Sequence, residues 1–296
     1  MVASKPMFRS PSDVDPAELL KQRRASIDAV YEELRALGPN APGEQVAIVV
    51  RSALELPMLD FLASLRGGTE RLVTQSVEEY SRFIPSASSN ASSAAGLVRI
   101  LLLQNVDLVW WDDVPDFETM ADIKASKDLL DLVALRRSGR VGFGFGIASD
   151  GLVRRGRDFL VQRAMPSREP RGPGLSFTQI RPAMLGVLNE VAACVSEIAP
   201  EGTPPLYVTS VIRTVEHQIH LKSLGFSALL PSAHCRGWAA DIEVAWFERF
   251  GAAGALQEVL IDYLERGILN VIDEGRAWHV CLSPDHVERY RALGIA

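Results

Sequence analysis

Apolar residues recur at helical spacing through the first third of the chain. Asp15 is a typical N-cap residue with proline at the next position, and Gly38 marks an end. The apolar positions between them follow a period of three to four residues and comprise Leu19, Leu20, Ile27, Val30, Tyr31, Leu34 and Leu37. Two more helices are predicted over residues 43–56 and 69–83. This part of the chain is therefore predicted to be largely helical.

The pattern in the middle of the chain is less regular. The Ser/Ala-rich residues 86–95 are predicted to form a flexible connector. Residues 97–111 fit either a buried helix or a strand, and residues 116–136 fit a helix. Residues 140–147 alternate glycine with apolar residues and, with residues 152–161, predict a β-hairpin. Their glycine spacing lacks the Gly-x-Gly-x-x-Gly form, so we do not expect a dinucleotide site.

A segment rich in proline, glycine and charge, Met165–Gly174, predicts a domain boundary. We expect a mostly helical N-terminal region of unknown role over residues 1–171, which ends in this linker, and a second domain over residues 172–296. In that domain the pattern predicts helices at 178–198, at 214–224 and up to Gly267, and strands at 206–213, at 238–244 and on both sides of Glu274. The predicted fold class is α+β, with an antiparallel sheet that carries the functional site and helices on one side of it.

The candidate chemistry begins in the segment Ser-Ala-His-Cys-Arg-Gly-Trp-Ala-Ala-Asp, residues 232–241. A turn at Gly237 is expected to separate His234, in a loop, from Asp241, on the strand that follows. A second histidine, His279, lies in a short apolar strand downstream. Catalytic Zn²⁺ is usually held by three protein ligands, with the fourth position left for water. The three side chains are therefore candidate zinc ligands.

This combination resembles the zinc D-alanyl-D-alanine metallopeptidases, a group that shares its fold with lysostaphin-like enzymes and the hedgehog signalling domain. The family signature Ser-x-His-x-x-Gly-x-Ala-x-Asp is matched at Ser232, His234, Gly237, Ala239 and Asp241. The last family ligand, in a Trp-His strand, is matched by His279, and a strand-end arginine and a helix glutamine are matched by Arg213 and Gln218. The resemblance covers residues 205–283.

The resemblance implies a hedgehog/D-Ala-D-Ala-peptidase-like domain with zinc held by the three ligands named above. It implies that Arg213 stabilises an oxyanion or binds a substrate carboxylate, with Gln218 and Ser232 as further substrate contacts. Many members carry a catalytic glutamate three residues before the last histidine, where this chain has Arg276. Glu274 is then the candidate general base, and Asp273 is the alternative.

The substrate that the resemblance implies is a D-alanine-containing peptide, such as a peptidoglycan stem peptide. The expected activity is that of a zinc carboxypeptidase or endopeptidase, with Zn²⁺ as the cofactor. An alternative interpretation is a zinc-containing module that binds cell wall or a protein without turnover.

Composition adds limits to these expectations. The chain has 296 residues, 47% of them hydrophobic, and a net charge of −6, which gives no general support for nucleic-acid binding. The segment 136–171 holds nine arginines against three acids, and a solvated linker is favoured there over binding of an anionic polymer. No apolar run approaches the ~20 residues of a membrane helix. The N-terminus predicts no secretory signal, although the resemblance implies the cell envelope or periplasm.

The three cysteines are too few for a disulfide scaffold. Cys235 directly follows one proposed ligand and Cys281 lies two residues after another, so the two thiols are expected to be neighbours. They fit a disulfide in an oxidising compartment, or small core residues or rival soft ligands in a reducing one. Structural roles are favoured.

Overall fold

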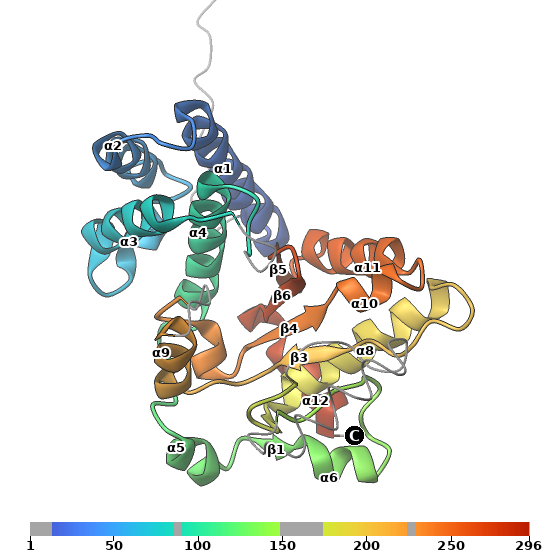
Figure 1. Ribbon diagram of the computed structural model, residues 1–296. Coiled ribbons are helices and arrows are strands. Elements are labelled where there is room, and N and C mark those ends of the chain that lie inside the picture. Colours follow the sequence, from blue (N-terminus) through green and yellow to red (C-terminus); the bar gives the residue numbers. More distant parts are fainter. Residues whose placement is uncertain (1–13, 86–89, 149–173, 224–228, 296) are drawn as a thin grey trace, which may run out of the picture.

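A computed structural model of the chain describes residues 14–85, 90–148, 174–223 and 229–295. The N-terminal part is helical, as predicted. Its elements are α1 (Pro16–Leu37), α2 (Gly43–Leu54), a short 3₁₀ helix η2 (Asp60–Ser64), α3 (Gly68–Arg82) and α4 (Ala94–Trp110). Figure 1 shows these helices, coloured blue to green, gathered on one side of the molecule.

Helix α4 resolves the alternative that the sequence left open for residues 97–111. It begins after Ser93, whose hydroxyl accepts a hydrogen bond from the Gly96 amide. Twelve of its seventeen residues are buried, and they lie on nearly every side of the helix. A helix buried all round has no polar face and so shows no helical period in its sequence. The apolar run therefore could not distinguish a helix from a strand.

The middle of the chain differs from the prediction. The single helix expected over residues 116–136 is replaced by α5 (Met120–Ala125), the two-residue strand β1 (Leu130–Asp131) and α6 (Leu132–Arg137). Asp131 ends the strand and caps α6, since its carboxylate accepts a hydrogen bond from the Ala134 amide. Such capping favours a helix start there over a continuous helix.

The hairpin predicted for residues 140–161 is only partly within the described residues. Gly144 forms a parallel bridge with Tyr207, and Ile147 forms one with Leu175. Neither partner belongs to residues 152–161, which lie outside the described residues, as does most of the linker at 165–174. The short strand β2 (Gln179–Ile180) pairs with β1.

The residues of the candidate site lie on or beside a four-stranded antiparallel sheet. Its strands are β3 (Val208–Ser210), β4 (Ala239–Glu243), β5 (Leu269–Asp273) and β6 (Ala277–Leu282), in the spatial order β3-β4-β6-β5. The register places Asp241 opposite His279, and His279 opposite Ile272. Because directly paired residues point to the same face, these three side chains share one face of the sheet. The predicted strands around Asp241 and Glu274 are confirmed.

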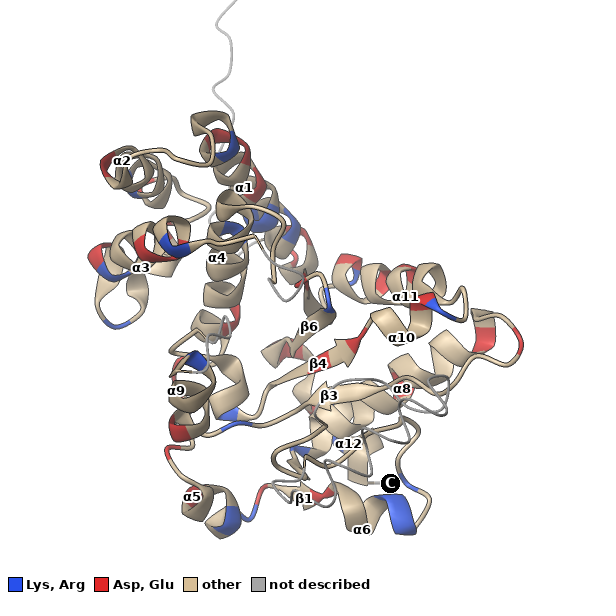
Figure 2. Ribbon diagram, in the orientation of Figure 1, with Lys and Arg blue, Asp and Glu red and all other residues tan. Residues whose placement is uncertain are grey.

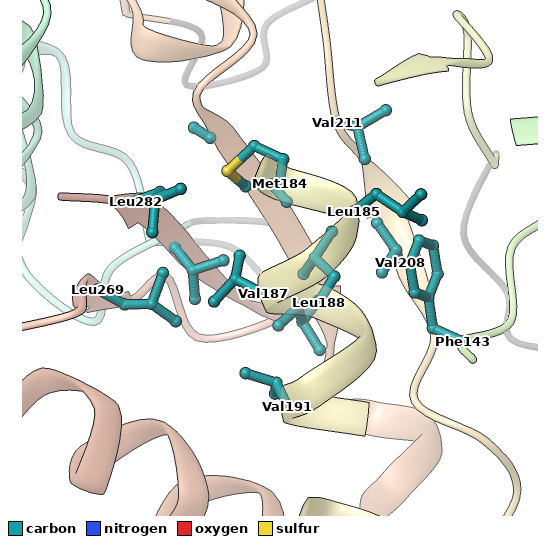
Figure 3. Packing of buried hydrophobic residues seen from close by; sticks show 14 of the residues in the cluster. Phe143, Met184, Leu185, Val187, Leu188, Val191, Val208, Val211, Leu269 and Leu282 are labelled. Carbon is teal, nitrogen blue, oxygen red and sulfur yellow. The ribbon is translucent and has the colours of Figure 1, made fainter. Parts of the chain in front are cut away.

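The other face of the sheet packs on helix α8 (Pro182–Ile198). Figure 3 shows the α8 side chains lying between side chains from the strand regions; the labelled residues include Met184, Leu185, Leu188, Val208, Leu269 and Leu282. All belong to one hydrophobic cluster and are buried. The terminal helix α12 (Val287–Ile295) packs on α8, where a Cβ on Gly294 would lie 1.8 Å from the Pro182 carbonyl oxygen. Only glycine allows this approach.

Three further helices complete this part: α9 (Val215–Ser223), α10 (Ala245–Glu248) and α11 (Ala253–Glu265). Two 3₁₀ turns, η3 (Ala233–Arg236) and η4 (Pro284–His286), connect elements. The fold is thus α+β, as predicted. The expectation of helices on one side of the sheet was wrong, because α4 contacts the face opposite α8, through hydrogen bonds to Asn270 and His279.

Two hydrophobic clusters divide the described residues. One joins α1 to α4 and includes Ile272 of the sheet, and the other runs from Trp111 to Tyr290. Along the chain, the first cluster therefore ends and the second begins near the end of α4. The sequence placed the domain boundary later, at residues 165–174. Residues 111–145 pack with the C-terminal sheet although they precede that segment.

Charged residues of both signs occur along the same N-terminal helices. Figure 2 shows Lys and Arg interspersed with Asp and Glu along α1 and α3. Within the described ranges, no helix has the length and apolar character needed to cross a membrane.

Candidate metal centre

The first ligand is held by a tight local turn. The Ser232 hydroxyl accepts a hydrogen bond from the His234 amide at the start of η3. Gly237 ends the turn with φ +74°, a left-handed conformation that favours glycine. The chain then enters β4, which carries Asp241. This turn explains why a histidine and an aspartate seven residues apart face the same point.

The three predicted ligands meet. His234 Nε2 lies 3.0 Å from Asp241 Oδ1 and 3.2 Å from His279 Nδ1, and the last two atoms are 3.3 Å apart. A tetrahedral zinc site with bonds of about 2.0–2.1 Å has ligand atoms separated by about 3.3–3.4 Å. The triangle is therefore close to the size that one tetrahedral cation requires. All three side chains are buried.

The outer hydrogen bonds of the two histidines leave acceptor atoms pointing inward. His234 Nδ1 lies 3.3 Å from the Val211 carbonyl oxygen, and His279 Nε2 lies 2.9 Å from Asp107 Oδ2. Both oxygens accept hydrogen bonds, so these outer nitrogens carry the protons. In neutral imidazoles the inner nitrogens then present lone pairs toward Asp241. Three acceptors converging on one point are the arrangement that a cation stabilises.

The charges of the group agree with this geometry. Burial lowers the pKa of His234 to about 4, so this imidazole is neutral near pH 7. Burial also acts to lower the pKa of His279, but its hydrogen bonds to Asp107 and Asp241 outweigh burial and raise the pKa to about 10. Without a cation, His279 therefore carries a second proton, on the Nδ1 atom that faces the other two ligands. A metal ion that binds here takes the place of that proton, and this buried group can hold a metal ion.

Arg213 holds Asp241 from the side. Its guanidinium forms an ion pair with Asp241 Oδ2, and its Nε donates a hydrogen bond to Ser210 Oγ over 2.9 Å. Burial acts to raise the pKa of Asp241, but His234 and Arg213 hold it well below its usual range. The carboxylate is thus ionised, with Oδ1 directed to the histidines and Oδ2 to the guanidinium. Arg213 stays partly exposed.

Gln218 and Ser232, predicted as substrate contacts, are both buried and have partners within the protein. Gln218 accepts a hydrogen bond from Arg213 over 3.3 Å and donates one to the Leu229 carbonyl over 2.9 Å. The Ser232 hydroxyl caps the turn that carries His234. Both contacts position Arg213 or His234, and substrate binding by these two residues stays a prediction.

Glu274 lies at the end of β5, in the tight turn to β6. Its amide donates to the Ala277 carbonyl, so the alternation of the strands places Glu274 on the same face as His279. Burial raises the pKa of Glu274 to about 7, against the opposing effect of the His279 charge. Asp273, the alternative base, is exposed and belongs to the opposite face, and its carboxylate accepts a hydrogen bond from the Gly275 amide.

Several polar residues around the centre were missed by the sequence analysis. Asp107 and Gln104, on α4, contact His279 and Glu274, and Asn90 contacts Glu274 as well. The sequence held one signal for the first two: they are among the few polar residues in a mostly apolar run, and a buried polar group needs a partner. The identity of that partner could not be read from the sequence.

Arg236 is a further missed residue. Its guanidinium donates hydrogen bonds to the Leu108 and Trp111 carbonyls at the end of α4 and pairs with Asp116 at 3.0 Å. This binds η3, and therefore the His234 loop, to α4. Arginine suits the position because its planar group offers several donors at once.

Cys235 and Cys281 are buried and free. Burial raises the pKa of the Cys235 thiol to about 12 and raises that of Cys281 well above its usual range. Thiols held in the protonated form are poor metal ligands. The structural roles favoured from the sequence agree with this.

The arrangement of the centre, two histidines and a carboxylate beside an arginine and a carboxyl of raised pKa, thus rests on this chain alone. No protein-family model, curated protein or solved structure matches this chain.

Proposed function

We propose that this protein is a zinc-dependent peptidase of the D-alanyl-D-alanine metallopeptidase type, with a hedgehog/peptidase-like C-terminal domain. The observation that carries the proposal is the convergence of His234, Asp241 and His279 on one point, with Arg213 and Glu274 beside it. The substrate class is a D-alanine-containing peptide, such as a peptidoglycan stem peptide. That part of the proposal is supported by the signature at residues 232–241.

The ligand set favours zinc over magnesium and calcium. Two imidazoles and one carboxylate suit Zn²⁺, whereas Mg²⁺ and Ca²⁺ prefer oxygen ligands only. Zn²⁺ held by these residues supplies Lewis-acid chemistry, which makes water a better nucleophile and polarises a carbonyl.

The other residues then have distinct roles. Glu274, with a pKa near 7, accepts a proton from the attacking water and returns it to the leaving amine. Arg213 retains N–H groups beyond those that bind Ser210, Gln218 and Asp241, and these donate to the developing oxyanion or to a substrate carboxylate. Burial of the ligands keeps competing water away and strengthens these electrostatic contacts.

The experiment compares Glu274→Gln with Asp273→Asn in the full chain. Zinc content is measured by elemental analysis, and cleavage is followed on a peptide that ends in D-Ala-D-Ala. Glu274→Gln is expected to keep zinc and lose about 10²–10⁴-fold in kcat. Asp273→Asn, on the exposed face of the same turn, is expected to keep both the zinc content and the kcat of the wild type. Equal activity in the wild type and Glu274→Gln contradicts the assigned base.

One observation favours the alternative, a zinc-containing module that binds cell wall or a protein without turnover. Both carboxylate oxygens of Glu274 accept amide hydrogen bonds, from Asn90 over 3.1 Å and from Gln104 over 2.6 Å. A carboxylate held in this way has fewer lone pairs free for a proton. Zinc binding by the wild type, together with retention on wall fragments and no cleavage of any of them, supports this alternative.

A further inference from the structure

Helix α4 contributes a buried carboxylate to the face of the sheet that bears the ligands. Asp107 is fully buried, as is Asn270 of β5 beside it. The Oδ2 atom of Asp107 accepts a hydrogen bond from His279 Nε2 over 2.9 Å, and its Oδ1 atom accepts one from Asn270 Nδ2 over 2.7 Å. Asn270 in turn accepts a hydrogen bond from Arg24 of α1. A continuous chain of hydrogen bonds therefore runs from α1 to His279.

A buried carboxylate in an apolar helix is unfavourable unless its partners compensate for the lost hydration. Among the described residues, Asp107 accepts hydrogen bonds from His279 and Asn270 and also contacts the neutral thiol of Cys281, and no guanidinium or ammonium pairs with it directly. Asn270 is neutral, so the imidazole of His279 is the partner whose charge or polarisation can balance the carboxylate. The geometry thus joins Asp107 to the metal centre.

The contact also fixes which nitrogen of His279 faces the other ligands. Because Asp107 can only accept, it keeps the proton on Nε2 and leaves Nδ1 directed to His234 and Asp241. A carboxylate behind a ligand histidine also makes the imidazole a stronger donor to the metal.

We propose that Asp107 is a positioning residue of the metal centre: it orients His279 so that the metal is bound through Nδ1. The N-terminal helical region, whose role the sequence left unknown, is then part of the metal centre. This inference rests on metal binding in the proposed function and does not depend on peptidase activity.

The test measures the affinity of the full-length protein for Zn²⁺ alone, by competition with a chromophoric chelator. Asp107→Asn keeps the shape and removes the charge, and Asp107→Ala removes the contact. Both are expected to weaken Zn²⁺ binding, by about 10–100-fold for the alanine variant. The visible spectrum of the Co²⁺-loaded protein is expected to change in both, which a loss of stability alone does not produce.

Asn105→Ala provides the matched control. Asn105 lies on α4 two residues earlier, is equally buried, and bonds to the Leu101 carbonyl and to Arg71 rather than to the metal ligands. It is expected to lower the melting temperature without changing the Zn²⁺ affinity or the Co²⁺ spectrum. A folded Asp107→Asn variant with wild-type affinity and spectrum overturns the inference.

A second measurement needs no variant. Nitrogen-15 NMR of the wild-type protein loaded with Zn²⁺ is expected to show His279 protonated at Nε2 and bound through Nδ1. Metal bound through Nε2 overturns the inference, because that atom then cannot donate to Asp107. A wild-type protein that binds no Zn²⁺ overturns the proposed function as well, whereas normal zinc binding with no effect of Asp107 overturns this inference alone.

Discussion

Gln104 Nε2 donates a hydrogen bond to Glu274 Oε1 over 2.6 Å, and the two residues lie 170 positions apart in the chain. The contact joins α4 to the turn between β5 and β6. Burial raises the pKa of Glu274 to about 7, and the hydrogen bond from Gln104 acts in the opposite direction by favouring the ionised form. The helix therefore has a direct effect on the protonation of the proposed base.

Replacing Gln104 with alanine is expected to raise the pKa of Glu274 further. The base must be ionised to accept a proton, so the acid limb of the pH profile of kcat/KM moves to higher pH and the rate below that limb falls. The check is a set of pH–rate profiles on a D-Ala-D-Ala peptide for the wild type and Gln104→Ala. An acid limb that stays in place, or moves to lower pH, contradicts the assignment of Glu274.

Metal binding is expected to release a proton. Because the pKa of His279 is raised to about 10, this imidazole is protonated at pH 8 in the metal-free protein, and a metal at Nδ1 displaces the proton. Apparent Zn²⁺ affinity is then expected to fall about tenfold for each unit of pH lowered from 9 to 7. Titration calorimetry in buffers of different ionisation enthalpy measures the released protons. His220→Ala, at an exposed position on α9, is the control and is expected to release the same number.

Gly237→Ala tests the turn that carries His234. The φ of +74° is strained for alanine, and the new Cβ would lie 3.3 Å from Arg181 Nε and 3.4 Å from Ile212. A loss of stability of about 1–2 kcal/mol is expected, together with weaker metal binding. Gly254→Ala is the matched control, since its Cβ meets nothing within 4 Å in helix α11, and it is expected to be neutral or stabilising by up to about 1 kcal/mol. Equal melting temperatures of the two variants contradict this account.

The loss of folding stability at acid pH is expected to depend on Glu190 of α8. Burial acts to raise its pKa, but hydrogen bonds from the Tyr263 and Tyr290 hydroxyls, over 2.8 and 2.9 Å, outweigh burial and lower it. A carboxyl whose pKa is lower in the folded state stabilises the protein above its unfolded-state pKa, and this contribution is lost as the pH falls through the folded pKa. Glu190→Gln is therefore expected to flatten the dependence of melting temperature on pH below about 4.5. A slope as steep as that of the wild type rules out this role.

Some parts of the fold followed from local pattern. Helix α1 was predictable because its buried side chains recur at helical spacing between clear end signals. The strands β4 and β6 were predictable from short apolar runs with turn residues at their ends. The residues between α4 and β2 were not, because Asp131 caps a short helix within a run that has continuous helical character. A capping side chain competes with helix propagation only weakly, and packing decides the result.

The sequence by itself determined the candidate ligands. A histidine in a 3₁₀ turn, a glycine with positive φ and an aspartate on the next strand form one local unit, and His279 stands out as a histidine in a short apolar strand. Helix α4 and its contacts were decided only by the tertiary structure. A helix that is buried on nearly every side loses the periodic signal that marks its faces, so nothing local showed that Asp107 meets His279, 172 positions away. Local geometry is encoded in neighbouring residues, whereas the partner of a buried charge depends on how distant elements pack.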